Sequence, residues 1–142
     1  MDTVSVYIKH ATLNKWLGAA DVASGLAPCL LDEVFQWTMN TTADDINLND
    51  YKSPIYFSTK DDNLHVTDHY LYTQGPLNVT TGNSLSVVDS DSSTEFHPGE
   101  IFSPPPGQPA LIAVGELFLS VDQNQVPFLS PEPIAGWFLS CV

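Results

Sequence analysis

The sequence predicts a single all-β domain, an antiparallel β-sandwich or barrel of about eight to ten short strands. Apolar and polar residues alternate with period two in several short runs, which is typical of half-buried strands. Clusters of Gly, Pro, Asn and Asp interrupt these runs at short intervals, and no stretch has the pattern of an amphipathic helix of three turns. The chain of 142 residues has the size of one domain, residues 1–142, and is too short for two.

Two strands are predicted in the first 40 residues. Apolar and polar residues alternate through 4–8, and 34–39 places Phe35, Trp37 and Met39 on one face. Between them, residues 14–28 are mostly small and contain Gly18, Gly25 and Pro28. We expect these three residues to break regular structure, so the stretch has room for at most one short helical turn near 19–24.

The middle of the chain alternates between predicted strands and polar loops. The predicted strands lie at 55–59, 64–66, 70–73, 85–88 and 110–114. The acidic segment 40–50 is expected to be an exposed loop. The segment 103–109, which contains Pro104, Pro105 and Pro106, is expected to be a stiff polyproline-like stretch on the surface.

The C-terminal segment, residues 115–142, organises the predicted fold. It contains a strand at 117–121, a polar turn at 122–125, a return strand at 126–129 and a final apolar run at 134–139. Several of the largest side chains lie at this end of the chain. We therefore expect the end to dock into the core, and its truncation to unfold the protein.

An internal similarity raises an alternative fold. Residues 56–64 resemble 118–126, each with apolar residues, a Ser, a polar turn and an apolar return, and the two stretches lie 62 positions apart. A β-trefoil of this length would repeat three times, about every 45–50 residues. No third copy is present, so the sandwich is preferred and the β-trefoil is the alternative.

The charge balance excludes two classes of partner. The chain has 17 acidic and 4 basic residues, a net charge of −13. Such a field repels polyphosphates and anionic lipid surfaces, which argues against nucleic acid and membrane as partners. It suits a soluble protein in an acidic extracellular medium. No signal-peptide pattern follows Met1, so if the protein is secreted we expect Met1 to replace a removed leader.

The two cysteines, Cys29 and Cys141, are 112 positions apart and match no zinc or redox motif. The choices are a disulfide or two free buried thiols, and we favour the disulfide, which implies an oxidising compartment. Closing so long a loop would contribute on the order of 4 kcal/mol in the chain-entropy model.

Two acceptor sequons for N-glycosylation are present, at Asn40 and Asn78. The composition predicts about 1.4 such sequons by chance. The two sequons are therefore compatible with secretion but are not an argument for it.

A family resemblance follows from the C-terminal motifs. The C-terminal part has a strand, an Asp-x-Asn turn, an apolar return strand and then the run 136–141. Further upstream, the sequence pairs Phe57 and Leu64 with the aromatic run 70–72, and one cysteine, Cys29, comes early. This combination resembles the small secreted fungal cell-wall proteins of the phialide (PhiA) type, over about a third of the chain. The resemblance implies a secreted fungal β-protein with no known catalytic residues. Residues 78–109 have no counterpart in it.

The search for chemistry gives no catalytic or metal site. His65 and His69 are four apart, but along a strand they are about 13 Å distant and cannot share one ion. Asp61, Asp62 and Asn63 lack the spacing of a calcium loop. The sequence has no nucleophile elbow or phosphate loop, and Cys29 is expected to be bridged rather than activated. We therefore predict a protein that is not an enzyme and has no catalytic residues, metal or cofactor.

Binding is the function that the sequence favours. Tyr70 and Tyr72, on a predicted strand, could stack on sugar rings or anchor a protein partner, and Pro104, Pro105 and Pro106 would present a preorganised surface. We expect a secreted, extracellular interaction protein. It would be an accessory subunit that stabilises a larger secreted enzyme such as an oxidase, or a cell-wall or matrix component. The alternatives are a lectin-like carbohydrate-binding module and a β-trefoil-type protease inhibitor.

Overall fold

The structure is a computed structural model that describes residues 3–22, 25–41, 55–60, 68–73, 76–89, 109 and 111–141. All regular structure in these residues is β-strand, which confirms the all-β prediction. The strands are β1 (Thr3–His10), β2 (Trp16–Val22), β3 (Gly25–Leu31), β4 (Gln36–Thr41), β5 (Ile55–Lys60), β6 (Asp68–Tyr72), β7 (Asn83–Ser84), β8 (Ser86–Asp89), β9 (Ala113–Val114), β10 (Leu117–Val121), β11 (Pro127–Ser130) and β12 (Trp137–Cys141).

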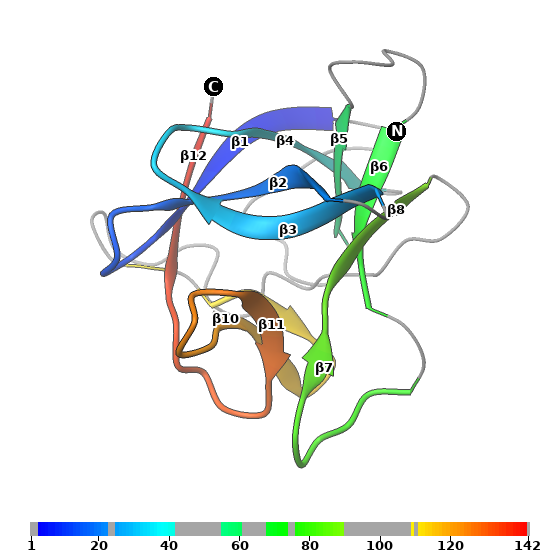
Figure 1. The fold of residues 1–142 in the computed structure, drawn as a ribbon, viewed down its shortest axis with the longest axis vertical. Helices are drawn as coiled ribbons and strands as arrows, with labels where there is room; N and C mark the ends of the chain where they lie inside the picture. The colour runs from blue at the N-terminus through cyan, green and yellow to red at the C-terminus, as the bar shows by residue number, and fades with distance from the viewer. Residues whose placement is uncertain are drawn as a thin grey trace.

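The strands form two antiparallel sheets. The larger sheet has the order β3-β2-β1-β4-β5-β6-β8, with β12 paired to β1, and the smaller has the order β7-β11-β10-β9. In Figure 1 the β2–β3 hairpin crosses in front of β1 and β4, and the smaller sheet lies below them. Among the described strands the sheets do not close into a barrel, so of the two predicted architectures the barrel is not the one found.

Strand β1 is the centre of the larger sheet. It pairs with β4 through Val6↔Trp37, with β2 through Lys9↔Trp16, and with β12 through Ile8↔Leu139. The alternation predicted for residues 4–8 is confirmed, since Val6 and Ile8 are buried and their neighbours are only partly so. The pairing of β1 with β12 joins the beginning of the chain to its end.

The helical turn predicted near residues 19–24 is wrong, because the chain there forms the β2–β3 hairpin. Gly18 is not a break in this hairpin. A Cβ at Gly18 would stand 2.9 Å from Cγ of Phe35, so the close approach of that ring requires glycine. Pro28 is tolerated because β3 stands at the end of the sheet order, where a missing N–H interrupts no further pairing.

The C-terminal segment forms the predicted strands and turn. Strands β10 and β11 pair from Phe118↔Ser130 to Val121↔Pro127. Between them, Asp122 accepts hydrogen bonds at Oδ1 from the backbone N–H groups of Asn124 (2.8 Å) and Val126 (3.0 Å). A short aspartate side chain that bonds its own backbone two residues on is the usual device for such a turn.

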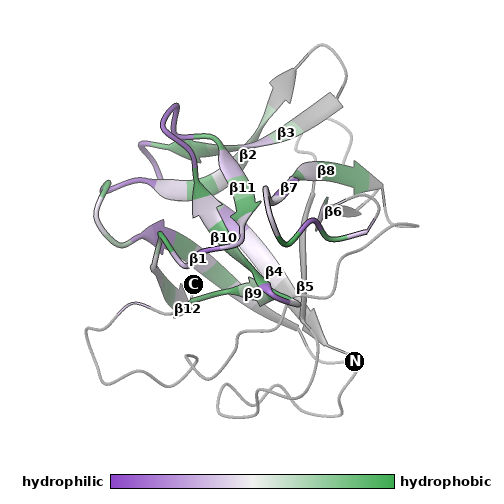
Figure 2. Cartoon of the chain, turned by 90° about the horizontal axis from the view of Figure 1, so that it is seen from below, coloured by the Kyte–Doolittle hydropathy of each residue, from purple (hydrophilic) through white to green (hydrophobic). Residues whose placement is uncertain are grey.

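A hydrophobic core lies between the sheets. It consists of buried residues from both of them: Val6, Ile8, Leu17, Trp37, Leu71, Val87, Ile112, Val114, Leu117, Leu119, Leu129, Ala135 and Trp137. Figure 2 shows hydrophobic colour along strands such as β8 and β12, and hydrophilic colour mainly at the turns. Burial of the C-terminal Trp137 confirms that this end of the chain docks into the core.

Two parts of the chain follow the same plan of a hairpin and a following strand. The indole N–H of Trp37, in β4, donates to the carbonyl of Leu17 in the β2–β3 hairpin (2.9 Å). The indole N–H of Trp137, in β12, donates to the carbonyl of Leu119 in the β10–β11 hairpin, also at 2.9 Å. The β-trefoil alternative requires three such units, and the described residues contain this hydrogen bond twice.

Several predicted segments lie outside the described residues. These are the predicted strand at 64–66 and most of the loop 40–50, with the triple proline Pro104, Pro105 and Pro106. The metal candidates Asp61, Asp62, Asn63 and His65 also lie outside them.

Candidate functional site

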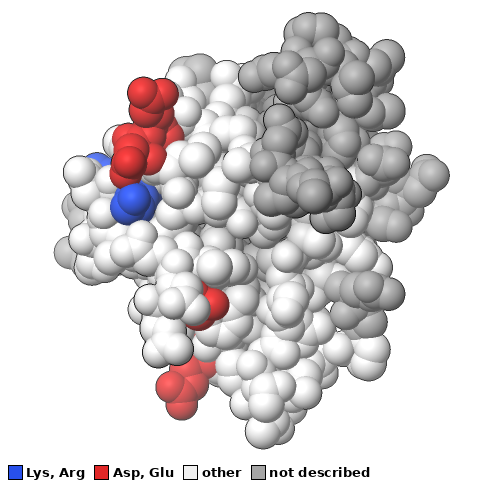
Figure 3. All heavy atoms as spheres, in the orientation of Figure 1, with Lys and Arg blue, Asp and Glu red and all other residues white. Residues whose placement is uncertain are grey.

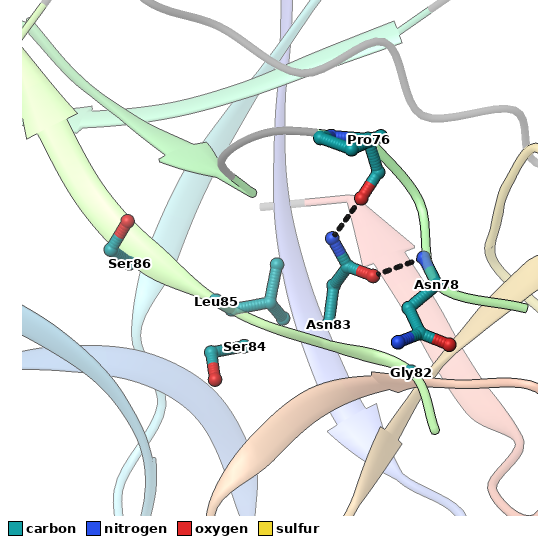
Figure 4. A pocket seen from close by; sticks show the side chains of 7 residues that line it. All are labelled: Pro76, Asn78, Gly82, Asn83, Ser84, Leu85 and Ser86. Atoms are coloured by element: carbon teal, nitrogen blue, oxygen red, sulfur yellow. Dashed lines mark hydrogen bonds between the residues drawn. The ribbon is translucent and has the colours of Figure 1, made fainter. Parts of the chain in front are cut away.

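The connection between β6 and β8 forms an open pocket of about 480 Å³. It is lined by Pro76, Asn78, Gly82, Asn83, Ser84, Leu85 and Ser86, which Figure 4 shows from close by. The volume lies within the range of small-molecule sites. None of the seven lining residues carries a charge.

Two asparagine side chains build the wall of this pocket. Asn83 accepts a hydrogen bond at Oδ1 from the N–H of Asn78 (2.7 Å) and donates from Nδ2 to the carbonyl of Pro76 (3.2 Å). The side chain of Asn78 accepts at Oδ1 from the N–H groups of Thr80 and Thr81, both at 3.0 Å. These bonds hold residues 76–83 as one compact turn, an arrangement that asparagine side chains commonly make.

Gly82 closes the turn against the smaller sheet. Its φ is +86°, and a Cβ there would lie 2.1 Å from the carbonyl oxygen of Leu129 in β11. Its N–H donates to the carbonyl of Asn78 (2.8 Å). The backbone is therefore fixed at this point by a left-handed conformation and a close approach that only glycine allows.

The pocket offers hydrogen-bonding groups and a small apolar face, and its lining contains no nucleophile with an adjacent base. The lining includes the amides of Asn78 and Asn83, the hydroxyls of Ser84 and Ser86 and the apolar side chain of Leu85. The hydroxyl of Ser86 also donates to the carbonyl of Tyr72. Such a set can hold a neutral polyol or sugar by hydrogen bonds. It contains no acid or base for hydrolysis.

The two tyrosines predicted as an interaction surface lie on β6 and do not line the pocket. Tyr72 is half-buried, and its carbonyl accepts a hydrogen bond from the hydroxyl of Ser86 (3.4 Å). Tyr70 pairs with Ser58 and Val88, and its side chain lies outside the described residues. The structure thus places both residues inside a sheet, flanked by β5 and β8.

The structure does not show the predicted bridge between Cys29 and Cys141. Cys29 is a free, half-buried thiol on β3, and the side chain of Cys141 lies outside the described residues. Burial raises the pKa of the Cys29 thiol, so it stays protonated and unreactive.

His10 is a structural residue at the end of β1. Its Nδ1 accepts hydrogen bonds from the N–H groups of Thr12 (3.1 Å) and Leu13 (3.2 Å), and its ring stands edge-on to Trp137 with centroids 5.1 Å apart. Burial lowers the pKa of His10. The neutral ring with an unprotonated Nδ1 is therefore the form that can accept both hydrogen bonds of this turn.

Within the described part of the chain, no group of three or more His, Cys, Asp or Glu is arranged to hold a metal ion. His69 and Asp68 lie on β6 beside Thr59 and Lys60 of β5. In the same described ranges, no helix is long and apolar enough to cross a membrane.

Among the residues whose burial the structure describes, four large aliphatic side chains are exposed, and each stands in a connection between strands. They are Val34 (52% exposed), Val79 (54%), Val126 (48%) and Ile134 (58%). Val34 and Ile134 occupy the same place in the two similar units, three residues before Trp37 and Trp137. The sequence analysis did not identify these residues as exposed, because it placed Val34, Val126 and Ile134 at the start of predicted strands or apolar runs.

Two lysines contact other side chains of the chain. Lys15 bonds Asp32 at 2.9 Å, and Lys9 stands over the ring of Trp16, 5.1 Å from its centroid. In Figure 3 acidic and basic side chains lie together at the upper left, further acidic side chains lie lower on the same face, and much of the remaining described surface in that view is uncharged. Lys9 and Lys15 therefore already have a partner within the chain.

No family model matches this chain, and searches of curated proteins and of solved structures found no match either.

Proposed function

We propose that this protein is a secreted, non-catalytic interaction protein that binds and stabilises a larger secreted protein. The single observation that supports this proposal is the set of exposed aliphatic side chains in the connections, Val34, Val79, Val126 and Ile134. The centre of an interface is apolar and has few charges, and these four exposed side chains are the apolar contacts that we assign to it.

The net charge of −13 restricts the partner. An acidic partner would be repelled during the encounter, whereas a neutral or basic protein surface would be attracted. Because Lys9 and Lys15 are already engaged with Trp16 and Asp32, they add little attraction for an acidic surface. We therefore expect the partner to present an apolar patch with a neutral or basic rim.

The proposal is tested by gel filtration of the native secreted fluid, with mass identification of every chain that co-elutes. Elution with a larger protein at fixed stoichiometry supports an accessory subunit. Elution alone near 15.5 kDa would overturn the subunit role and favour a cell-wall or matrix component.

A pair of variants then tests the surface. Ile134→Lys places a charge on an exposed anchor, and Ser140→Lys makes the same charge change at an exposed position of β12. Since both side chains face solvent, neither change should alter stability by more than about 0.5 kcal/mol. We expect Ile134→Lys to weaken partner binding about tenfold or more and Ser140→Lys to leave it unchanged. Equal affinities of the two variants would exclude this anchor.

A further inference from the structure

The turn that walls the pocket also carries one of the two sequons. Asn78, Val79 and Thr80 are all exposed and stand between β6 and β7. The sequon at Asn40 lies instead in β4, where Asn40 pairs with Thr3 of β1 on one side and Tyr56 of β5 on the other. An exposed turn is the usual setting for a modified asparagine, so the two sequons are not equivalent.

The hydrogen bonds of Asn78 leave its amide nitrogen available. Its Oδ1 accepts from the N–H groups of Thr80 and Thr81, which fixes the plane of the side-chain amide. Within the described residues Nδ2 donates no hydrogen bond. Figure 4 shows this nitrogen on the side of Asn83 and the oxygen on the opposite side. A group attached to Nδ2 would therefore break no bond of the turn and would start beside the pocket.

The pocket suits the first sugar of such a group. A pyranose presents hydroxyls at its rim and C–H groups on its faces. The lining provides hydroxyls from Ser84 and Ser86 and an apolar contact from Leu85, with no charge to be desolvated. The volume of about 480 Å³ is within the range that holds a small ligand.

We propose that Asn78 carries an N-linked glycan and that the first sugar of this glycan lies in the pocket formed by residues 76–86. In the transfer step, Nδ2 attacks the anomeric carbon of a polyprenyl-diphosphate-linked oligosaccharide. The new N–C bond replaces the C–O bond to the diphosphate, which leaves with its electron pair, and one amide proton passes to a base of the transferase. No oxidation or reduction takes place.

This inference rests on the secreted location in the proposed function, and its test is independent of any partner. The chain is secreted alone from a eukaryotic host, and glycans are released enzymatically in heavy-oxygen water. We expect Asn78 to become a heavy-oxygen-labelled Asp in the wild type. An unlabelled Asn78 in the secreted wild type would overturn the proposed site, while the co-elution experiment on native fluid would still stand.

Three variants control the site. Asn78→Asp keeps an oxygen that accepts the two N–H bonds of the turn but removes the acceptor nitrogen. Thr80→Ala removes the sequon and leaves both backbone bonds, and Thr80→Ser keeps the sequon. We expect label in Thr80→Ser and none in Asn78→Asp or Thr80→Ala. Label that persists at Asn78 in Thr80→Ala would contradict sequon-dependent transfer.

Amide hydrogen exchange tests whether the first sugar occupies the pocket. Protein trimmed to one sugar is compared with protein from the Thr80→Ala variant, in which the turn is unmodified. We expect backbone amides of residues 83–86 to exchange about threefold more slowly, or slower still, when the sugar is present, with no change in the distant β2–β3 hairpin. Equal exchange at 83–86 in the two proteins would overturn the placement of the sugar in the pocket.

Discussion

The close contact at Gly18 allows a quantitative test of the fold. A Cβ added there would stand 2.5 Å from Cδ1 of Leu31 and 2.9 Å from Cγ of Phe35. The Leu31 methyl can rotate away, but the Phe35 ring packs against Trp37, with centroids 5.3 Å apart. Gly18→Ala should therefore overpack the core and cost about 1–3 kcal/mol. For a chain of this length we expect the melting temperature to fall by about 3–9 °C.

A double-mutant cycle with Phe35→Ala identifies the cause. Phe35→Ala alone removes a half-buried ring and should cost roughly 2 kcal/mol, because the ring is only partly removed from water. In that background Gly18→Ala gains room and should cost less than about 0.5 kcal/mol. The cost of Gly18→Ala should thus be lower by about 0.5–3 kcal/mol in the Phe35→Ala background than in the wild type, and this difference is the coupling energy.

The assay is urea unfolding followed by tryptophan fluorescence, which reports on the core through Trp37 and Trp137. If the cost of the double variant equals the sum of the two single-variant costs within about 0.5 kcal/mol, the claim that Phe35 is the reason for glycine at position 18 is refuted. The β10–β11 hairpin with β12 offers a natural comparison, because it repeats the plan of β2–β3 with β4. Ser120 and Ala135 occupy there the positions of Gly18 and Phe35. The hairpin residue is thus larger, and the residue two positions before the tryptophan is smaller.

Three further predictions concern stability. Trp137→Phe leaves the buried carbonyl of Leu119 without its indole donor, and denaturant unfolding should show a loss of about 1–3 kcal/mol; an unchanged stability would contradict this. Burial lowers the pKa of His10 in the folded state below its unfolded value, so its contribution to stability is complete above about pH 6.5 and declines as pH falls through the folded pKa. His10→Asn keeps a side-chain acceptor that does not titrate. The difference in unfolding free energy between wild type and variant should therefore be constant above that pH, and in acid the wild type should lose stability relative to the variant. A difference that does not vary with pH would contradict this. Because Cys29 is a free thiol of raised pKa, a reductant should not move the unfolding midpoint, and a thiol reagent should label Cys29 faster after unfolding; a midpoint lowered by reductant would show that a bridge exists.

Alternation of apolar and polar residues was sufficient to predict those strands that bury one face. It predicted β1, where Val6 and Ile8 are buried and Ser5, Tyr7 and Lys9 are only partly so. It failed at β2 and β3, where Gly18 and Pro28 suggested a break. Glycine at position 18 is explained by Phe35, 17 residues away, and a sequence pattern does not reveal such a contact.

The candidate site was predictable only in part. The sequon identified Asn78, since three adjacent residues define it. The role of Asn83 was not predictable, because it depends on bonds to Asn78 and Pro76 that exist only once the turn has formed. The relation between Trp37 and Trp137 was also missed. Their partners precede them by 20 and 18 residues, and this unequal spacing hides the repeat.

The pairing of β1 with β12 determines when folding can be completed during synthesis. Residues 6–10 find their partners in residues 137–141, so this edge of β1 stays open until residues 137–141 have been made. At about 5–20 residues per second, the ribosome would need roughly 6–25 s to extend the chain from β1 to β12. During that interval the exposed edge of β1 is a template for pairing with another chain. We therefore expect the nascent protein to depend on chaperones more than the finished protein does.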